Sequence, residues 1–244
     1  MFVGMISEGE DKLFDKWKKG MPRDLEKHFI PDGIANEAIW GENPEGNNEK
    51  KLKLIFFLKE VNGGEKWDER NYLKEYNSDR NYINSHSPTI TALTQLAYGL
   101  FHHADETKWE KIESEVTDGS IIQTNVLKRI ALVNVKKIAG LGTADYGKID
   151  KFFNNKMNKN NLKEQLDLYS RNSTDQVVII CGATDWYYKQ LYEGLDWKQT
   201  SRGIEYCKQD NKKIVIAFCH PLARVLQNIK YYALIDAFNE ILKS

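Results

Sequence analysis

Polar side chains follow four apolar, strand-like segments of this chain, and their types are those that acid–base chemistry uses. The segments are 54–58, followed by Lys59 and Glu60; 130–133, followed by Asn134; 177–180, followed by Cys181, Gly182 and Thr184; and 214–218, followed by Cys219, His220 and Pro221. In an open parallel sheet, ligands bind in the crevice beyond the carboxyl ends of the strands. We therefore expect a carboxylate, a carboxamide and an imidazole to meet at one site, although they come from distant parts of the chain.

The hydrophobic spacing predicts strands that alternate with helices. Strands are expected at 52–60, 130–135, 176–181 and 213–218, with a short antiparallel strand at 204–207. Helices are expected where apolar residues recur at helical spacing, at 8–19, 87–100, 109–116, 145–157, 161–169, 186–192 and 225–242. Residues 20–50 read as a long irregular segment, and residues 65–85 as a loop or short helices over the crevice.

This alternation predicts a three-layer α/β/α domain around a central, mostly parallel sheet of about four strands. We expect a single domain over residues 1–244, with a helical or irregular N-terminal extension at about 1–50. A chain of 244 residues with 41% hydrophobic content is long enough for one sizeable core.

The composition bears on the compartment of the protein and on the kind of partner it binds. Acidic and basic residues balance at 35 each, so the total charge favours no polyanionic partner and excludes none. No apolar run reaches the roughly 20 residues that cross a bilayer, and the N-terminus does not resemble a signal peptide. Three cysteines without a CxxC pair fit a reducing cytoplasm. We expect a cytoplasmic protein without membrane contact, and we favour a monomer.

Three of the strand-end motifs resemble those of the uracil-DNA glycosylase superfamily. Residues 131–137 read Ala-Leu-Val-Asn-Val-Lys-Lys, 177–184 read Val-Val-Ile-Ile-Cys-Gly-Ala-Thr, and 215–221 read Val-Ile-Ala-Phe-Cys-His-Pro. The upstream strand ending in Lys59 and Glu60 completes the order of motifs. The resemblance implies that Glu60 positions the hydrolytic water, Asn134 reads the base edge, and His220 stabilises the leaving base. It also implies a wedge residue in the loop after His220.

Two motifs depart from the family pattern. The first is usually Gly-x-(Asp, Glu or Asn)-Pro-(Tyr or Gly), whereas this chain has Leu58-Lys59-Glu60-Val61-Asn62. The last is usually His-Pro-Ser-Pro, whereas here Leu222 and Ala223 follow Pro221, and Arg224 falls where some members carry arginine. These departures indicate a divergent branch.

Each catalytic candidate also has a structural interpretation. A carboxylate at Glu60 suits an oxocarbenium-like transition state, but it could equally be a surface residue paired with Lys59. The carboxamide of Asn134 offers a donor and an acceptor to a pyrimidine edge, but a strand-end Asn often caps a loop. His220 precedes a proline, which favours an extended backbone, and the alternative is a histidine satisfied within the fold.

The remaining assignments surround these three residues. Substrate binding is assigned to Lys59, Asn62, Gly182 and Thr184, beside Asn134. Nucleic-acid contact is assigned to Lys136, Lys137, Pro221, Leu222 and Arg224, because the stretch 125–163 is basic and Lys136 and Lys137 would border the crevice. A base could stack on Trp67, Tyr72, Tyr76 or Tyr82, although packing onto the sheet is the commoner role of such rings. We expect no metal site, since Cys181, Cys219 and His220 lack a fourth ligand, and no cofactor.

The sequence thus predicts a DNA-glycosylase-like hydrolase of DNA repair that cleaves the N-glycosidic bond of a deaminated or damaged, uracil-like base. Two alternatives remain open at this point. The same fold could bind a nucleic acid or nucleotide without chemistry, or it could hydrolyse a small nucleoside-type molecule.

Overall fold

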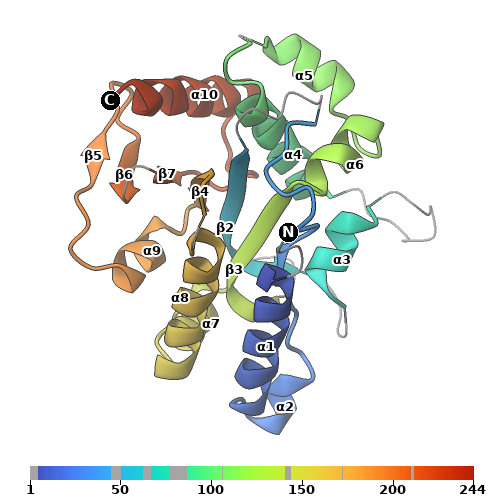
Figure 1. Ribbon diagram of the computed structural model, residues 1–244, viewed down its shortest axis with the longest axis vertical. Helices are drawn as coiled ribbons and strands as arrows, with labels where there is room; N and C mark the ends of the chain where they lie inside the picture. The colour runs from blue at the N-terminus through green and yellow to red at the C-terminus, as the bar shows by residue number, and fades with distance from the viewer. Residues whose placement is uncertain are drawn as a thin grey trace.

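A computed structural model describes residues 5–44, 51–62, 67–76, 87–105, 107–140, 144–171, 173–209 and 212–244. The described strands form one seven-stranded sheet in the order β1-β3-β2-β4-β7-β6-β5 (Figure 1). Their bounds are β1 Gly33–Ile34, β2 Leu52–Asn62, β3 Ile130–Gly140, β4 Gln176–Gly182, β5 Lys198–Gln199, β6 Glu205–Gln209 and β7 Lys213–Phe218.

The four central strands, β3, β2, β4 and β7, run parallel, and β6 pairs antiparallel with β7. The predicted parallel core and the antiparallel strand near 204–207 are therefore confirmed. The central strands are rich in Val, Ile, Leu and Phe because helices cover both faces of the sheet.

The prediction of about four strands was too low, because it did not include two short edge strands. β5 pairs with β6, and β1 pairs antiparallel with β3 through Gly33 opposite Leu132. β1 lies inside 20–50, which was expected to be irregular. A strand of only two residues has no alternation for sequence analysis to detect. The N-terminal region is thus part of the sheet at its β1 edge.

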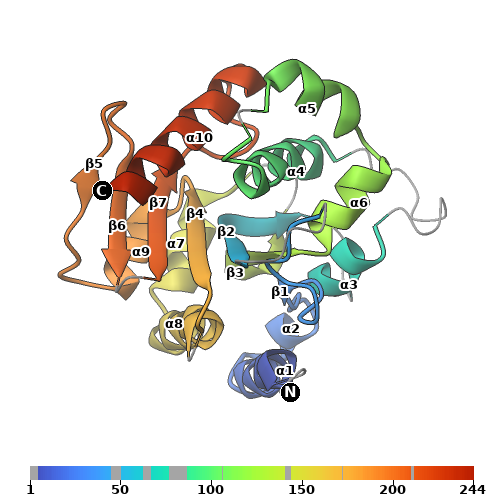
Figure 2. The same cartoon turned by 45° about the horizontal axis from the view of Figure 1, so that its top comes forward.

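Helices cover the two faces of the sheet (Figure 2). One face packs against α4 Pro88–Phe101, α5 Trp109–Glu115, α6 Ile121–Leu127 and α10 Gln227–Lys243, with α3 Glu69–Lys74 at its β1 side. The other face packs against α1 Met5–Lys19, α7 Tyr146–Phe153, α8 Lys156–Ser170 and α9 Asp185–Leu191; the short α2 spans Arg23–Glu26. Within the described part of the chain, no helix combines the length and apolar character needed to cross a membrane.

One pair of predicted helices breaks at a different place. The sequence suggested helices at 145–157 and 161–169, whereas α7 ends at Phe153 and α8 begins at Lys156. Asn155 causes the break, because its side-chain oxygen accepts hydrogen bonds from the backbone N–H groups of Met157 and Asn158 and so caps α8.

Candidate functional site

The strand order brings the predicted strand-end residues together at the carboxyl ends of the central strands. The chain leaves β2 for β3 on one side and later enters β4 on the other, so the topological switch point lies between β2 and β4. Glu60 is paired in register with Lys136 of β3, and Gly182 of β4 lies beside Phe218 of β7. His220 follows the end of β7 by two residues.

The carboxylate of Glu60 is buried at this edge, with 2% of its side chain exposed. Its Oε2 accepts a hydrogen bond from Lys136 Nζ at 2.5 Å, whereas its Oε1 has no partner among the described residues. A Cβ at Gly140 would lie 2.5 Å from the carboxyl carbon, so the glycine leaves room for the carboxylate in the position it holds. Glu60 is therefore neither a surface residue nor a partner of Lys59, and one of its oxygens is unshared.

Lys136 and Lys137 do not form the exposed basic rim that the sequence suggested. Lys136 is 7% exposed and paired with Glu60. Lys137 is fully buried on the opposite face of β3, and its Nζ lies 2.6 and 2.7 Å from the two carboxylate oxygens of Asp32. Neither ammonium group reaches the surface without breaking an ion pair, so this geometry gives no support to their assignment to phosphate contact, which stays a prediction.

Asn134 does not end its strand, because β3 continues to Gly140. Its side chain is buried, and Nδ2 donates to Asp32 Oδ2 at 3.1 Å and to Glu69 Oε2 at 2.7 Å. Both amide hydrogens are thus engaged inside the protein. The assignment of Asn134 to a base edge stays a prediction, and Oδ1 alone has no hydrogen bond to a described residue.

The ring of His220 is held by its own loop. The backbone N–H of Leu222 donates to Nδ1 at 3.1 Å, so a neutral ring carries its proton on Nε2. Burial lowers the pKa of His220, and the nearby ammonium groups of Lys59 and Lys230 lower it further. The ring is therefore a neutral hydrogen-bond donor at physiological pH.

The segment from Gly182 to Thr184 ties the ends of β4 and β7 to the middle of β2. Thr184 Oγ1 donates to the carbonyl of Phe57 at 2.6 Å, and the N–H of Ala183 donates to the carbonyl of Phe218 at 2.7 Å. Ala183 has φ of 60°, a left-handed conformation that is costly for a residue with a Cβ. A Cβ at Gly182 would lie 2.7 Å from Leu58 Cδ2. The assignment of Gly182 and Thr184 to substrate binding stays a prediction, beside this structural role.

The other predicted contact residues differ in how exposed they are. Lys59 is half-buried, and its ammonium group lies over the Tyr146 ring and donates to the hydroxyl of that residue. Pro221 is buried, whereas Leu222 and Arg224 are exposed in the loop that follows His220. Asn62 is the last residue of β2. Their roles in binding remain predictions.

Two of the aromatic candidates pack within the fold. The rings of Tyr72 and Tyr76 meet edge to face at 5.3 Å, and Trp67 contacts Tyr72 at 5.6 Å. The Tyr76 hydroxyl donates to Asp118 at 2.7 Å, and its ring belongs to the core. Tyr82 and most of the loop expected at 65–85 lie outside the described residues.

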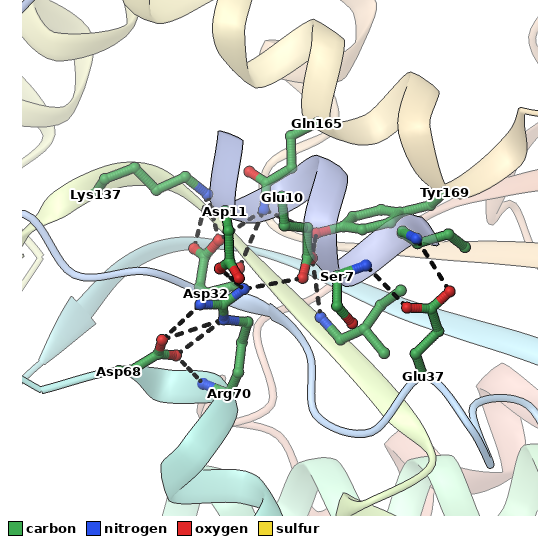
Figure 3. Close-up of polar contacts among 12 residues, drawn as sticks. Ser7, Glu10, Asp11, Asp32, Glu37, Asp68, Arg70, Lys137, Gln165 and Tyr169 are labelled. Carbon is green, nitrogen blue, oxygen red and sulfur yellow. Dashed lines mark hydrogen bonds and ion pairs between the residues drawn. The ribbon is translucent and has the colours of Figure 1, made fainter. Parts of the chain in front are cut away.

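A buried polar network around Asp32 and Glu10 was not predicted from the sequence (Figure 3). Asp32 accepts from Lys137, from Gln165 Nε2 at 2.9 Å and from the backbone N–H of Asn134 at 2.7 Å. Glu10 accepts from Tyr169 at 2.5 Å and pairs with Arg70 at 3.2 Å. The network joins α1, α3 and α8 to β3.

Two carboxyl groups of this network have strongly shifted pKa values. Burial raises the pKa of Glu10 to about 7, against the opposing effects of Tyr169 and Arg70. Burial and then the charge of Asp32 raise the pKa of Glu69 to about 8. Burial also lowers the pKa of Lys137, although Asp32 opposes this. These carboxyl groups therefore titrate near neutral pH.

The sequence pattern indicates that two members of this network, Glu10 and Lys137, occupy core positions. Glu10 shares helical spacing with Leu13, Phe14 and Trp17, which are all buried. Lys137 likewise follows Val133 and Val135 in the alternation of β3. A charged residue at a core position needs a buried partner. The sequence pattern does not identify that partner, because Asp32 lies 105 residues from Lys137 and local spacing carries no information about so distant a contact.

The chain matches no protein-family model, no curated protein and no solved structure. The resemblance to the glycosylase superfamily therefore rests on the short motifs alone.

Proposed function

We propose that this protein hydrolyses the N-glycosidic bond of a deaminated or damaged base in DNA. The observation that carries the proposal is that two groups follow neighbouring parts of one sheet: Glu60, a buried carboxylate with one oxygen unpartnered among the described residues, and His220, a neutral imidazole with its proton on Nε2. They lie at the ends of β2 and β7, which β4 alone separates. At about 4.8 Å per strand, a separation of roughly 10 Å is expected between their backbones across the end of β4.

Glu60 has the geometry of a water-orienting group. Lys136 occupies Oε2, so Oε1 is the oxygen that would accept a hydrogen bond from the attacking water. The carboxylate also stabilises the positive charge that develops on the sugar as the bond to the base lengthens. The water oxygen bonds to the anomeric carbon, and its proton passes to the carboxylate.

His220 serves the leaving base. As the glycosidic bond breaks, its electron pair leaves with the base, and a hydrogen bond from Nε2 stabilises the developing anion. Because burial, and after it the charges of Lys59 and Lys230, lower the pKa of His220, the ring stays neutral and keeps this donor in place. The surrounding cations also favour an anion at this position.

The loop after His220 would contact the nucleic acid. Leu222 is the apolar wedge of this proposal, and Arg224 is the phosphate contact, since both are exposed. The chemistry needs no cofactor. The three cysteines are free thiols, and we propose a monomer in the reducing cytoplasm.

One observation favours a second candidate, a nucleotide-binding protein without catalysis. The ammonium of Lys136 neutralises Glu60 at 2.5 Å, and Asn134 is engaged by Asp32 and Glu69. A carboxylate tied in this way is a weaker base than a free one. The two candidates predict the same crevice but differ in product formation.

A cleavage assay tests the proposal. Single- and double-stranded oligonucleotides carrying uracil, hypoxanthine or xanthine are incubated with the wild type and with Glu60→Gln. We expect abasic product from the wild type and a loss of about 100-fold or more in the variant, because the amide cannot take the proton of the water.

Thermal unfolding of Glu60→Gln and activity of His103→Asn are the controls. His103 pairs with Asn239 between α4 and α10, away from the strand ends, so its replacement should leave cleavage unchanged. Full activity in Glu60→Gln would contradict the catalytic assignment. Binding without product would favour the second candidate, and product from free nucleosides alone would indicate a small-molecule hydrolase.

A further inference from the structure

A pocket of about 790 Å³ lies at the opposite end of the sheet from the candidate site. Lys51 and Lys53, at the start of β2, line it together with Asp175, which directly precedes β4. Lys53 and Glu60 are seven residues apart on β2, which corresponds to roughly 23 Å at about 3.3 Å per residue. The pocket is therefore separate from the carboxyl ends of the strands.

Much of the pocket wall is apolar. Aliphatic lining comes from the first turn of α1, the segment between β1 and β2, and α8, through Met5, Ile6, Ala38 and Leu168. The rings of Trp40 and Tyr169, which meet edge to face at 5.8 Å, also line the pocket and are buried. A volume of this size falls in the range of small-ligand sites, and such a lining suits the flat apolar ring of a ligand.

The two carboxylates that line the pocket are engaged within the protein. Glu37 accepts from the backbone N–H groups of Ile6 at 3.0 Å and Ser7 at 2.9 Å, and so satisfies two donors at the start of α1 (Figure 3). Asp175 pairs with Lys53 at 2.9 Å, and the same ammonium group lies 3.2 Å from Ser173 Oγ. A cationic ligand would have to break one of these contacts to reach a carboxylate.

Arg171 differs from the other cations of the pocket. Lys51 pairs with Glu42 at 3.0 Å, and Lys53 pairs with Asp175. Arg171 follows the last turn of α8 and is exposed, and its guanidinium group forms no hydrogen bond or ion pair with any residue that the structure describes. A guanidinium group matches the two oxygens of a carboxylate. The pocket thus combines an apolar wall with one uncommitted positive charge.

We propose that this pocket binds a small molecule made of an apolar ring and a carboxylate. The ring packs against α1 and α8, and the carboxylate accepts hydrogen bonds from Arg171. A neutral analogue lacks the charge-assisted part of this contact, and a cationic analogue is repelled by Arg171. Because the pocket lies away from Glu60 and His220, the inference is independent of the proposed hydrolysis.

Isothermal titration calorimetry of the full-length protein tests the inference with three probes. They are 2-naphthylacetate, its uncharged amide 2-naphthylacetamide, and acetate, which has the charge but no ring. We expect 2-naphthylacetate to bind with a Kd below about 1 mM. The amide and acetate should each bind at least about tenfold more weakly, because each lacks one of the two features that the pocket recognises.

Two variants locate the binding site. Arg171→Gln should weaken the binding of 2-naphthylacetate by about tenfold and leave that of the amide unchanged, since the amide carries no charge. Met5→Ser, at a residue that is 60% exposed at the start of α1, should weaken the binding of acid and amide alike by about threefold. Arg23→Gln is the matched control for charge, because Arg23 is exposed on α2 and does not line the pocket.

Three results would overturn the inference. The first is no detectable binding of 2-naphthylacetate up to about 10 mM. The second is equal affinity for the acid and the amide, which would remove the role of the charge. The third is an affinity that Arg171→Gln leaves unchanged, or that Arg23→Gln lowers as much, because the acid would then bind elsewhere or through the general charge of the surface.

Discussion

At the scale of single residues, two adjacent lysines show how burial decides chemistry. Side chains alternate along a strand, so Lys136 and Lys137 enter opposite layers of the molecule. Lys136 meets the carboxylate of the proposed active site, whereas Lys137 meets Asp32 in a fully buried pair. A buried charge without its partner is strongly unfavourable. Both lysines therefore stabilise the fold, and Lys136 alone also contacts the proposed active site.

We expect Lys137→Met to lower the free energy of unfolding by about 3–5 kcal/mol, because it leaves Asp32 as an unpaired buried charge. Urea denaturation measures this change. The double variant Asp32→Asn with Lys137→Met removes both charges and should recover much of the loss. Lys136→Met is the matched single change; it leaves the buried carboxylate of Glu60 unpaired, so it should lower the stability and also reduce cleavage. Equal, small losses of stability in Lys136→Met and Lys137→Met would contradict this account of the buried pair.

At the scale of elements, one short segment ties the ends of β4 and β7 to the middle of β2. Ala183 bonds to the carbonyl of Phe218, and Thr184 bonds to the carbonyl of Phe57. The left-handed conformation of Ala183 makes both contacts possible within adjacent residues. This segment fixes the spacing between the strand that carries Glu60 and the strand that precedes His220.

Thr184→Val should lower the free energy of unfolding by about 1–3 kcal/mol, since the buried carbonyl of Phe57 would lose its partner. The change should also reduce cleavage, because the end of β4 would lose its tie to β2. Thr184→Ser keeps the hydroxyl and serves as the control in denaturation and cleavage measurements. A loss in the serine variant as large as that in the valine variant would show that the methyl group, and not the hydrogen bond, matters.

At the scale of the whole molecule, buried acids outnumber the buried bases that face them. Glu10, Asp32 and Glu69 share one network with the fully buried Lys137 and the partly buried Arg70. Because a buried negative charge is costly, Glu10 and Glu69 hold protons to higher pH than they would in water. The fold therefore contains carboxyl groups whose titration couples to its stability.

This coupling predicts that the protein becomes less stable as the pH rises from about 5 to about 8. The pKa values of Glu10 and Glu69 rise from 4.5 in water to about 7 and about 8 in the fold. In this window the folded state binds more protons than the unfolded state, so the free energy of unfolding falls with pH. Each group contributes at most about 1.4 kcal/mol per pH unit.

Urea denaturation across this pH range measures the slope. The variants Glu10→Gln and Glu69→Gln should each flatten it, because an amide does not titrate. Glu164→Gln is a control, since Glu164 lies in a surface pair with Lys16. A stability that rises with pH, or a slope unchanged in both network variants, would contradict the prediction.

The sequence by itself determined the parallel core and the positions of Glu60 and His220 near its edge. Apolar runs and helical spacing are local properties, so they can be read without knowing what packs against them. Even the topology that brings β2 beside both β3 and β4 agrees with the expectation that the strand ends meet.

Only the tertiary structure decided what the polar residues near this edge do. Lys137 and Asn134 were assigned to the ligand, yet they bond to Asp32 and Glu69, which come from distant parts of the chain. The alternation of side chains along a strand shows which layer a side chain enters, but it does not show which group that side chain contacts there. The partner depends on the pairing of β1 with β3 and on the docking of α3, and these are contacts between segments that no local pattern records.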